Sequence, residues 1–245
     1  MHAAFPHTGE ERCLSGRAGS GTVFFRGCNL QCAHSQNWRT GEGGEGREVS
    51  AEALAEVMLE LQGQGCHNVN LVSPSHVVAQ LLEAVSIAAV RGLRLPLVYN
   101  TDGYDDREAL RLLDGVVDIY VPDVKYADDV SARRDSKVRN FASVNRAAVR
   151  EMHRQVGDLV LDGDGLALRG LLVRHPVLPG GLSGTGRVLR FVARELSTST
   201  WVTLTGRVRP CYRAGEHPEP GPDDLAAAAV AAGRLGLRRV EGALG

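Results

Sequence analysis

Two of the five cysteines stand close together near the start of the chain. Cys28 and Cys32 are separated by three residues, whereas Cys13, Cys66 and Cys211 are widely spread. The opening residues, MHAAFPHTGEER, lack the basic and then apolar stretches of a secretory signal, so we expect a reduced, cytoplasmic protein. In such a protein a cluster of cysteines indicates a metal or redox site rather than a disulfide.

Further polar side chains stand at the ends of predicted strands. Because parallel strands bring their carboxyl ends to one edge of a sheet, where sites form, we expect these side chains to lie close together. They are Asn100, Asp123, Lys125, Arg174 and His175, with Ser73 and His76 as weaker candidates. Each also has a structural explanation: Asp123 and Lys125 as a solvated ion pair, Arg174 as the partner of a carboxylate below the barrel, and His175 as a core histidine.

The elements that position these residues alternate between predicted strands and helices. The predicted strands cover 22–26, 68–73, 95–100, 116–122, 170–178, 201–205 and 237–240. The predicted helices cover 50–63, 75–91, 106–113, 143–156, 185–196 and 222–235, with Ser50 as the cap of the first. Such alternation implies right-handed βαβ units, and about six of them predict an α/β fold with a partial parallel (β/α)6 barrel.

Composition and charge exclude several classes of protein. The 245 residues include 28 Lys and Arg against 29 Asp and Glu, so the formal charge is -1 and there is no basic excess for nucleic acid. No apolar run approaches the roughly 18 residues of a membrane span. The hydrophobic fraction of 43% is that of an ordinary globular protein. We predict a single domain over residues 1–245, with an N-terminal arm at 1–20 and a surface loop at 206–222.

The segment Gly27–Trp38, GCNLQCAHSQNW, resembles the cluster-binding loop of radical S-adenosylmethionine (SAM) enzymes. Several segments resemble the subgroup related to pyruvate formate-lyase-activating enzyme: GSGTVFFRGCNLQC, HNVNLVSPSHVV, LVYNTDGYD, LLDGVVDIYVPDVKYAD and LLVRHPVLPGG. The resemblance implies a radical SAM barrel whose mouth holds a 4Fe–4S cluster and SAM. It also implies reductive cleavage of SAM to a 5′-deoxyadenosyl radical.

The resemblance assigns roles to residues by their position. Cys28, Cys32 and the residue at the third ligand position, Ser35, would form the metal site. His34 replaces the family's usual aromatic residue and would lie against the adenine of SAM. The SAM pocket would also take in the polar residues at strand ends, Asn100, Asp123, Lys125 and Arg174. His175 is the candidate catalytic residue, in a charged pair with Arg174 that faces the same cavity.

Ser35 departs from the family's Cys-x3-Cys-x2-Cys pattern, because serine is far less acidic than a thiol and its alkoxide is a hard ligand. Four outcomes are open. Ser35 or water binds the cluster, another cysteine supplies the third thiolate, the chain has lost radical chemistry, or Cys28, Cys32 and His34 bind zinc. Cys211 is the best substitute, Cys66 is expected at the opposite end of the barrel, and Cys13 would serve only if the arm crosses the mouth.

Two functional hypotheses follow. The first is a SAM-dependent iron–sulfur radical enzyme similar to the activators of glycyl radical enzymes. It would act on a small-molecule or protein substrate and need a one-electron donor such as a flavodoxin or ferredoxin. The alternative is a catalytically degenerate family member acting as a binding module. Ser35 favours the alternative, as do the departures at 206–208, at 129–145, and at Asp102, where a small residue is expected. Neither nucleic acid nor a membrane is an expected partner.

Overall fold

A computed structural model describes residues 1–30, 32, 46–206 and 221–243 of the chain. The strands are β1 (Ala3–His7), β2 (Ser20–Phe24), β3 (Val69–Val72), β4 (Leu97–Thr101), β5 (Ile119–Pro122), β6 (Val160–Leu161), β7 (Ala167–Pro176), β8 (Trp201–Thr205) and β9 (Arg239–Ala243). The helices are α1 (Arg12–Ser15), α3 (Ala51–Gly63), α4 (Val78–Val90), α5 (Arg107–Leu112), α6 (Asp129–Ser136), α7 (Phe141–Val156), α8 (Thr185–Phe191) and α9 (Pro222–Arg234). A 3-10 turn covers Pro179–Gly181, and a π-helical turn, Val192–Leu196, continues α8.

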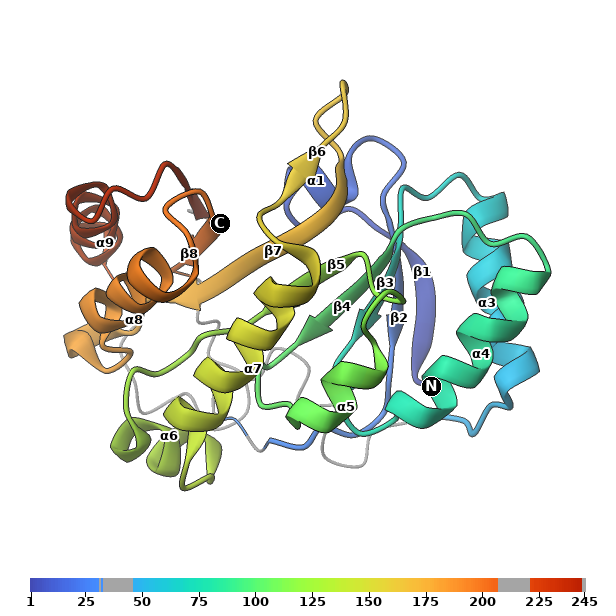
Figure 1. Cartoon of the computed structure of the whole chain (residues 1–245), viewed down its shortest axis with the longest axis horizontal. Helices are drawn as coiled ribbons and strands as arrows, with labels where there is room; N and C mark the ends of the chain where they lie inside the picture. The colour runs from blue at the N-terminus through green and yellow to red at the C-terminus, as the bar shows by residue number, and fades with distance from the viewer. Residues whose placement is uncertain (31, 33–45, 207–220, 244–245) are drawn as a thin grey trace.

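The nine strands form one curved sheet (Figure 1). Its order is β1-β2-β3-β4-β5-β7-β8-β9, with β6 paired to β7 outside that path. β1 pairs antiparallel with β2, and β6 pairs antiparallel with β7. The other neighbouring strands are parallel. The sheet order begins at β1 and ends at β9, so the sheet is open. This confirms the partial parallel barrel that the alternation of strands and helices predicted.

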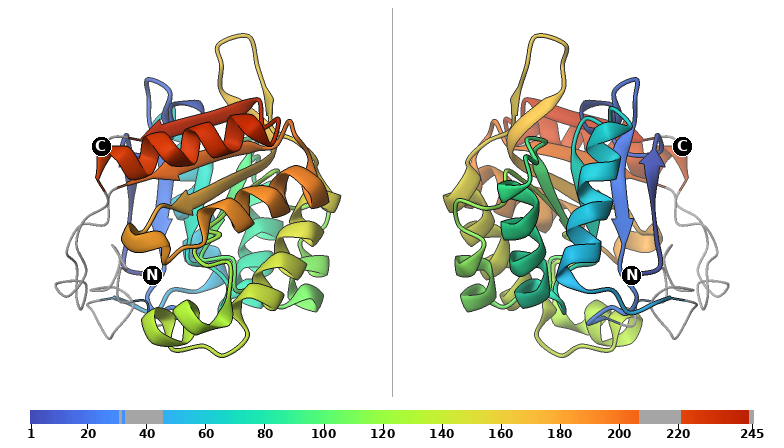
Figure 2. Two further views of the ribbon diagram at one scale, coloured as in Figure 1. Left: turned by 90° about the vertical axis from the view of Figure 1, so that its left-hand side faces the viewer. Right: turned by 90° about the vertical axis from the view of Figure 1, so that its right-hand side faces the viewer.

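Helices cover the outer face of the sheet, and a short helix fills one end of the inner face (Figures 1 and 2). The main core lies between the sheet and α3, α4, α5, α7, α8 and α9. On the inner face, Cys13 and Leu14 of α1 pack with Val98 and Leu172. Asn68 Nδ2 donates a 2.8 Å hydrogen bond to the Leu14 carbonyl, which fixes α1 at the amino-terminal ends of the strands. The carboxyl ends remain for the loop that carries the two cysteines.

Local sequence explains how the regular elements begin and why the central strands are apolar. Ser50 caps α3 as predicted, because its side chain accepts a hydrogen bond from the Ala53 amide. Asp106 caps α5 in the same way through the Glu108 and Ala109 amides. The strand Val69–Val72 is buried along its whole length, which is typical of a parallel strand covered on both faces.

The structure adds elements that the sequence did not predict, among them the short strand β6. The predicted arm, residues 1–20, contains the edge strand β1 and the helix α1. Helix α6 lies within the segment 129–145, and Asp128 caps it by accepting from the Val130 and Ser131 amides. Helix α4 also begins three residues later than expected, at Val78. Most of the predicted loop 206–222 lies outside the described residues.

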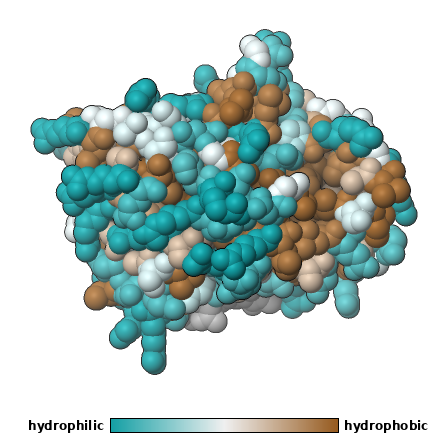
Figure 3. Space-filling model, in the orientation of Figure 1, coloured by the Kyte–Doolittle hydropathy of each residue, from teal (hydrophilic) through white to brown (hydrophobic). Residues whose placement is uncertain are grey.

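Within the described ranges, no helix combines the length and apolar character needed to cross a bilayer. Figure 3 shows that the helical face seen in Figure 1 is mainly hydrophilic over α7 and α8 and more hydrophobic toward α4. Val90 and Leu112, the last residues of α4 and α5, are exposed apolar side chains. Single exposed apolar side chains of this kind are normal for a folded domain.

Candidate functional site

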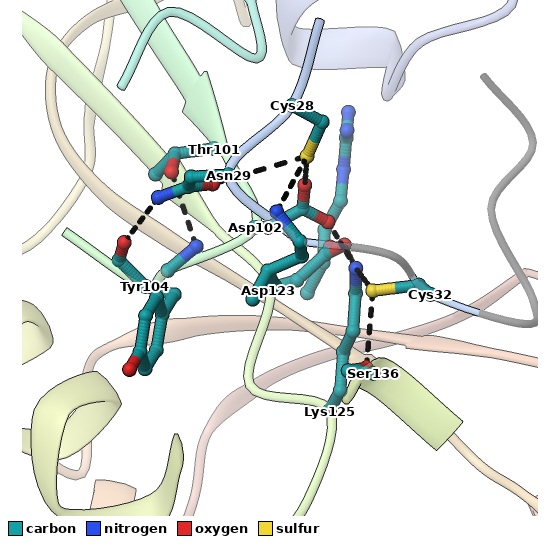
Figure 4. A network of polar contacts seen from close by, with 12 residues as sticks. Cys28, Asn29, Cys32, Thr101, Asp102, Tyr104, Asp123, Lys125 and Ser136 are labelled. Carbon is teal, nitrogen blue, oxygen red and sulfur yellow. Dashed lines mark hydrogen bonds and ion pairs between the residues drawn. The ribbon is translucent and has the colours of Figure 1, made fainter. Parts of the chain in front are cut away.

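Cys28 and Cys32 lie in the loop after β2, at the carboxyl end of the sheet (Figure 4). Cys28 Sγ donates a hydrogen bond to Asp102 Oδ2, and the two atoms are 3.0 Å apart. Cys32 is buried, and its Sγ lies 3.0 Å from Ser136 Oγ and 3.5 Å from Lys125 Nζ. The structure therefore places both thiols against the pair formed by Asp102 and Lys125.

Lys125 joins two carboxylates at this end of the sheet. Its ammonium pairs with Asp102 and lies 3.4 Å from Asp123 Oδ2. Burial would lower the pKa of Lys125, but Asp102, Cys32 and Asp123 raise that pKa well above its ordinary value. Burial would raise the pKa of Asp102, yet Lys125 lowers it overall, whereas burial keeps the pKa of Asp123 raised. Lys125 and Asp102 are therefore both charged at neutral pH.

The two thiols lie in surroundings that favour their protonated form. Burial, followed by the charge of Asp102, raises the pKa of Cys28. Burial also raises the pKa of Cys32, although the Lys125 ammonium opposes this effect. Thiolate is the form that binds a metal, so metal binding displaces both protons. A bound metal would supply the positive charge that two buried thiolates require.

A tight turn after β4 presents Asp102 to the cysteine loop. Gly103 continues this turn with a φ of 72°, a left-handed conformation that favours glycine. Thr101 Oγ1 accepts a 3.1 Å hydrogen bond from the Gly103 amide. Asn145 Nδ2, on α7, donates to the carbonyls of Gly103 and Asp123 at 3.0 and 2.9 Å. One helix side chain therefore ties the Asp102 turn to the strand end that carries Asp123 and Lys125.

Arg174 lies on the inner face of β7 and is paired from below. Its Nε donates to Glu11 Oε1 at 2.8 Å, and Nη2 also pairs with Glu10. Its Nη1 donates to Asn100 Oδ1 at 3.2 Å. Burial would lower the pKa of Arg174, but Glu11 and Glu10 raise it well above its ordinary value. The structure thus brings Asn100 and Arg174 together. Glu10 and Glu11 are carboxylate partners of Arg174, which agrees with its explanation as a structural ion pair.

His175 lies on the other face of β7, among the helices. Its Nδ1 is 2.6 Å from the Val124 carbonyl, its Nε2 is 3.0 Å from Thr185 Oγ1, and the residue is fully buried. Burial lowers its pKa to about 4, so the ring is neutral at pH 7. Neighbouring residues of a strand point to opposite faces. His175 and Arg174 therefore do not face the same cavity, contrary to the expectation from the sequence. A catalytic role for His175 stays a prediction.

The weaker candidates lie at the rim of the sheet. Ser73 follows β3 with a φ of 55°, and its amide donates to the Asn100 carbonyl at 2.9 Å. His76 Nε2 lies 2.7 Å from the Arg26 carbonyl. His76 therefore supports the backbone that leads into Cys28, which is a positioning contact rather than contact with the cysteine itself.

Three predicted residues, His34, Ser35 and Cys211, lie outside the described residues, so their roles stay predictions. Among the other cysteines, Cys13 packs at the amino-terminal end of the barrel and Cys66 packs between the sheet and the helices. The arm therefore does not carry Cys13 across the mouth. In the part of the chain that the structure describes, no three His, Cys, Asp or Glu side chains converge as ligands of one metal ion.

Several residues that build the site were missed from the sequence. Asp102 departs from the small residue of the family, yet it directly follows β4, just as Asp123 follows β5. Ser136 and Asn145 belong to the segment 129–145, which also departs from the family. Glu10 and Glu11 lie in the arm, and no local pattern connects them to Arg174, which lies more than 160 residues later in the chain.

Comparison with protein families matches residues 22–160, more than half of the chain, to the radical SAM superfamily. The matched range begins in β2 and ends in β6. It includes both thiols, the Asp102 turn and the strand end that carries Asp123 and Lys125.

Comparisons with single proteins agree with this match. The chain is 27% identical over 223 residues to the uncharacterised protein MJ0674 of Methanocaldococcus jannaschii. The matched region makes up 88% of this chain and 60% of MJ0674. SuiB of Streptococcus suis, bound to the precursor peptide SuiA, has a TM-score of 0.63 at 8% identity, over 90% of this chain and 47% of that one. A domain of pyruvate-formate lyase-activating enzyme from Bacteroides vulgatus has a TM-score of 0.50 at 12% identity. That similarity covers 69% of this chain and 92% of the domain. The two structural similarities show a shared fold.

Proposed function

The chain belongs to the radical SAM superfamily, and from that premise we propose that it holds a 4Fe–4S cluster at Cys28 and Cys32 and cleaves SAM reductively. When bound, the cluster and SAM supply a one-electron cleavage that yields a 5′-deoxyadenosyl radical. One observation carries the proposal: at the carboxyl end of the partial barrel, the Cys28 thiol contacts Asp102 and the Cys32 thiol contacts Lys125, which pairs with both Asp102 and Asp123.

The described residues fit an iron–sulfur cluster. Two soft thiols share one short loop, which is the donor type that such clusters need. The Lys125 ammonium, 3.5 Å from Cys32 Sγ, offsets part of the negative charge of a thiolate-bound cluster. Potentials of such clusters depend on hydrogen bonds to sulfur and on local charge. Lys125 is therefore placed to support the cluster as well as the carboxylates beside it.

The residues around the thiols have the charges that SAM requires. SAM carries an amino group and a carboxylate, and we assign Asp123 to the first and Lys125 to the second. Asn100 and Arg174 lie deeper on the inner face, where Arg174 orients the Asn100 side chain through its 3.2 Å hydrogen bond. These side chains bind and orient the cofactor, while the strands around them exclude water.

We further propose a reaction similar to that of the activators of glycyl radical enzymes. Support comes from the sequence segments that resemble that subgroup and from the fold shared with an activating-enzyme domain. The substrate is a small molecule or a protein. A one-electron donor, such as a flavodoxin or ferredoxin, supplies the electron.

A second candidate function is a binding module without radical chemistry. The observation that favours it is the Asp102–Lys125 pair, which satisfies both charges beside the thiols with protein groups alone. Ser35, in place of the third cysteine, also favours it. This candidate predicts a stable fold without iron and a ligand bound at the same mouth.

Product analysis separates the two candidates. The protein is reconstituted anaerobically with iron and sulfide, reduced, and incubated with SAM, and 5′-deoxyadenosine is quantified by chromatography. The proposal predicts the product from the native chain and none from Cys28→Ala or Cys32→Ala, because each removes a cluster ligand. Cys66→Ala, a buried cysteine outside the site, is the matched control and retains the product. A loaded native chain that forms no 5′-deoxyadenosine would instead support the binding module.

A further inference from the structure

Helix α6 ends beside the cysteine loop at the mouth of the partial barrel (Figures 1 and 4). Ser136, its last residue, is buried, with its Oγ 3.0 Å from Cys32 Sγ and 3.1 Å from Tyr126 Oη. Leu30 packs in the same apolar cluster as Cys32 and Ala132. The end of α6 is therefore fixed against one of the two thiols.

The exposed side chains at this end of α6 are basic. The exposed cations of the segment are Arg133, Arg134, Lys137 and Arg139, which we call the basic rim. Arg134 pairs with the carboxylate of Asp135, and Lys137 Nζ donates to the Arg134 carbonyl at 2.8 Å. Among the residues that the structure describes, neither Arg133 nor Arg139 forms an ion pair.

The acidic residues of the same segment leave most of this charge uncompensated. Asp128 pairs with Arg187, which lies outside the basic rim. Asp129 accepts a 2.9 Å hydrogen bond from an amide of α7, and Asp135 is only 1% exposed. The chain as a whole has a formal charge of -1, so the basic rim differs in sign from the protein that carries it.

We propose that the basic rim is the docking surface for the one-electron donor, an acidic carrier protein of the flavodoxin or ferredoxin type. The inference rests on the proposed function, which needs such a donor, and goes beyond it by placing the donor on this chain. A carrier on the rim contacts Lys137, and the residue before it, Ser136, contacts Cys32. One electron passes from the carrier, which is oxidised, to the cluster, which is reduced, and no bond of this chain forms or breaks.

The size and the charge of the basic rim suit an electron carrier. Complexes between electron-transfer proteins have small, transient interfaces, so a few charged residues are sufficient. Opposite charges on the two partners steer their encounter and raise the association rate. Nucleic acid would require a more extensive basic surface than a chain with a formal charge of -1 provides.

The first test measures binding rather than activity. An acidic flavodoxin in its oxidised form is titrated into the reconstituted protein by calorimetry, and an acidic ferredoxin is titrated in parallel. The rim variant combines Arg133→Glu with Arg139→Glu. We expect it to bind the carrier about tenfold more weakly than the native chain at about 20 mM salt, with a much smaller difference at about 300 mM, because salt screens exposed charges.

The matched control combines Arg194→Glu with Arg234→Glu, which changes the net charge by the same amount. Both residues are exposed and, within the described ranges, form no ion pair. They lie near the ends of the helical segments that lead into the starts of β8 and β9, at the end of the sheet opposite the cysteines. We expect this control to bind the carrier as the native chain does, and thermal unfolding checks that both variants are folded.

The second test compares two reductants in the formation of 5′-deoxyadenosine from SAM without added substrate. With reduced flavodoxin, the rim variant should need about ten times more carrier than the native chain for half its maximal rate. With dithionite, a small reductant that needs no docking surface, the rim variant and the native chain should form the product at equal rates.

Three results would overturn the proposal: the native chain binds neither carrier, the rim variant binds as the native chain does, or the rim variant is impaired equally with dithionite. Equal binding together with product formed with dithionite removes the docking surface alone, and the proposed function stands. Binding that depends on the basic rim, in a native chain that forms no 5′-deoxyadenosine with dithionite, contradicts the proposed function and leaves the docking surface standing.

Discussion

The protonation states of two buried residues, Lys125 and His175, are set by the groups that surround them. Lys125 stays an ammonium because carboxylates surround it, whereas His175, buried between a carbonyl and a hydroxyl, stays neutral. Lys125 follows β5, whereas His175 lies near the end of β7. On β7, the face on which a side chain lies separates Arg174, which contacts Asn100, from His175, which is buried in the core.

His175 predicts a pH dependence of stability. Its folded pKa of about 4 lies below the ordinary value near 6.5, so between these values the unfolded chain binds a proton that the folded chain does not. Stability is therefore full above pH 6.5 and falls as the pH falls toward 4. Between pH 7 and pH 5 we expect a loss of about 2 kcal/mol from this residue.

Urea unfolding of the native chain and His175→Asn at pH 7 and pH 5 tests this prediction. The native free energy of unfolding falls more steeply with acidification than that of the variant, because asparagine does not titrate. Equal losses in the two proteins would show that the ring does not control this dependence.

At the scale of elements, the turn after β4 links the site to α7. Gly103 has a φ of 72°, and a Cβ there would lie 2.3 Å from Asn145 Nδ2 and 2.5 Å from the Asp123 carbonyl. Any side chain at this position is strained, and it also displaces the bonds by which Asn145 joins β4 to β5. The Asp102 carboxylate therefore depends on a glycine next to it.

Gly103→Ala is expected to lower the free energy of unfolding by about 3 kcal/mol and to reduce bound iron, because strain and the lost hydrogen bonds act together. The matched control is Gly115→Ala, which has a φ of 77° but no atom within 4 Å of the added Cβ. Strain alone should cost that variant about 1 kcal/mol. Equal costs in urea unfolding would show that crowding at the turn is unimportant.

Most elements were predictable because their signals are local. Alternating apolar segments marked the parallel strands, and Ser50 marked the start of α3. The missed elements have weak local signals: β1 is a short edge strand that contains Pro6, and α1 is a single turn. Their stability comes from packing at the end and edge of the barrel, which no sequence pattern displays.

At the scale of the whole molecule, the N-terminal segment is tied to a distant strand. Glu10 and Glu11 precede α1, and both carboxylates pair with Arg174 on β7. The partners stand more than 160 residues apart in the sequence. The family resemblance and the positions at strand ends predicted Cys28, Cys32, Asp123 and Lys125 as neighbours. Long-range contacts such as those of Arg174 with Glu10 and Glu11, or of Asp102 with Cys28, arise only from the folded barrel.

Arg174→Met is expected to lower the free energy of unfolding by about 3 kcal/mol at pH 7, because two buried carboxylates lose their counter-charge. Burial would raise the pKa of Glu11, but Arg174 holds it below the ordinary value, so this stabilisation is present at neutral pH and lost below about pH 4.5. The cost should therefore shrink on acidification. In urea unfolding at pH 7, adding Glu10→Gln and Glu11→Gln should recover part of the loss, and no recovery would contradict the pairing.

The most direct test of the central claim is EPR of the anaerobically reconstituted and reduced protein, recorded with and without SAM. The account predicts a 4Fe–4S signal in the native chain that SAM perturbs and that Cys28→Ala and Cys32→Ala abolish. A signal that appears only after Ser35→Cys would contradict it, because the natural chain would then keep the fold of the family without its cluster.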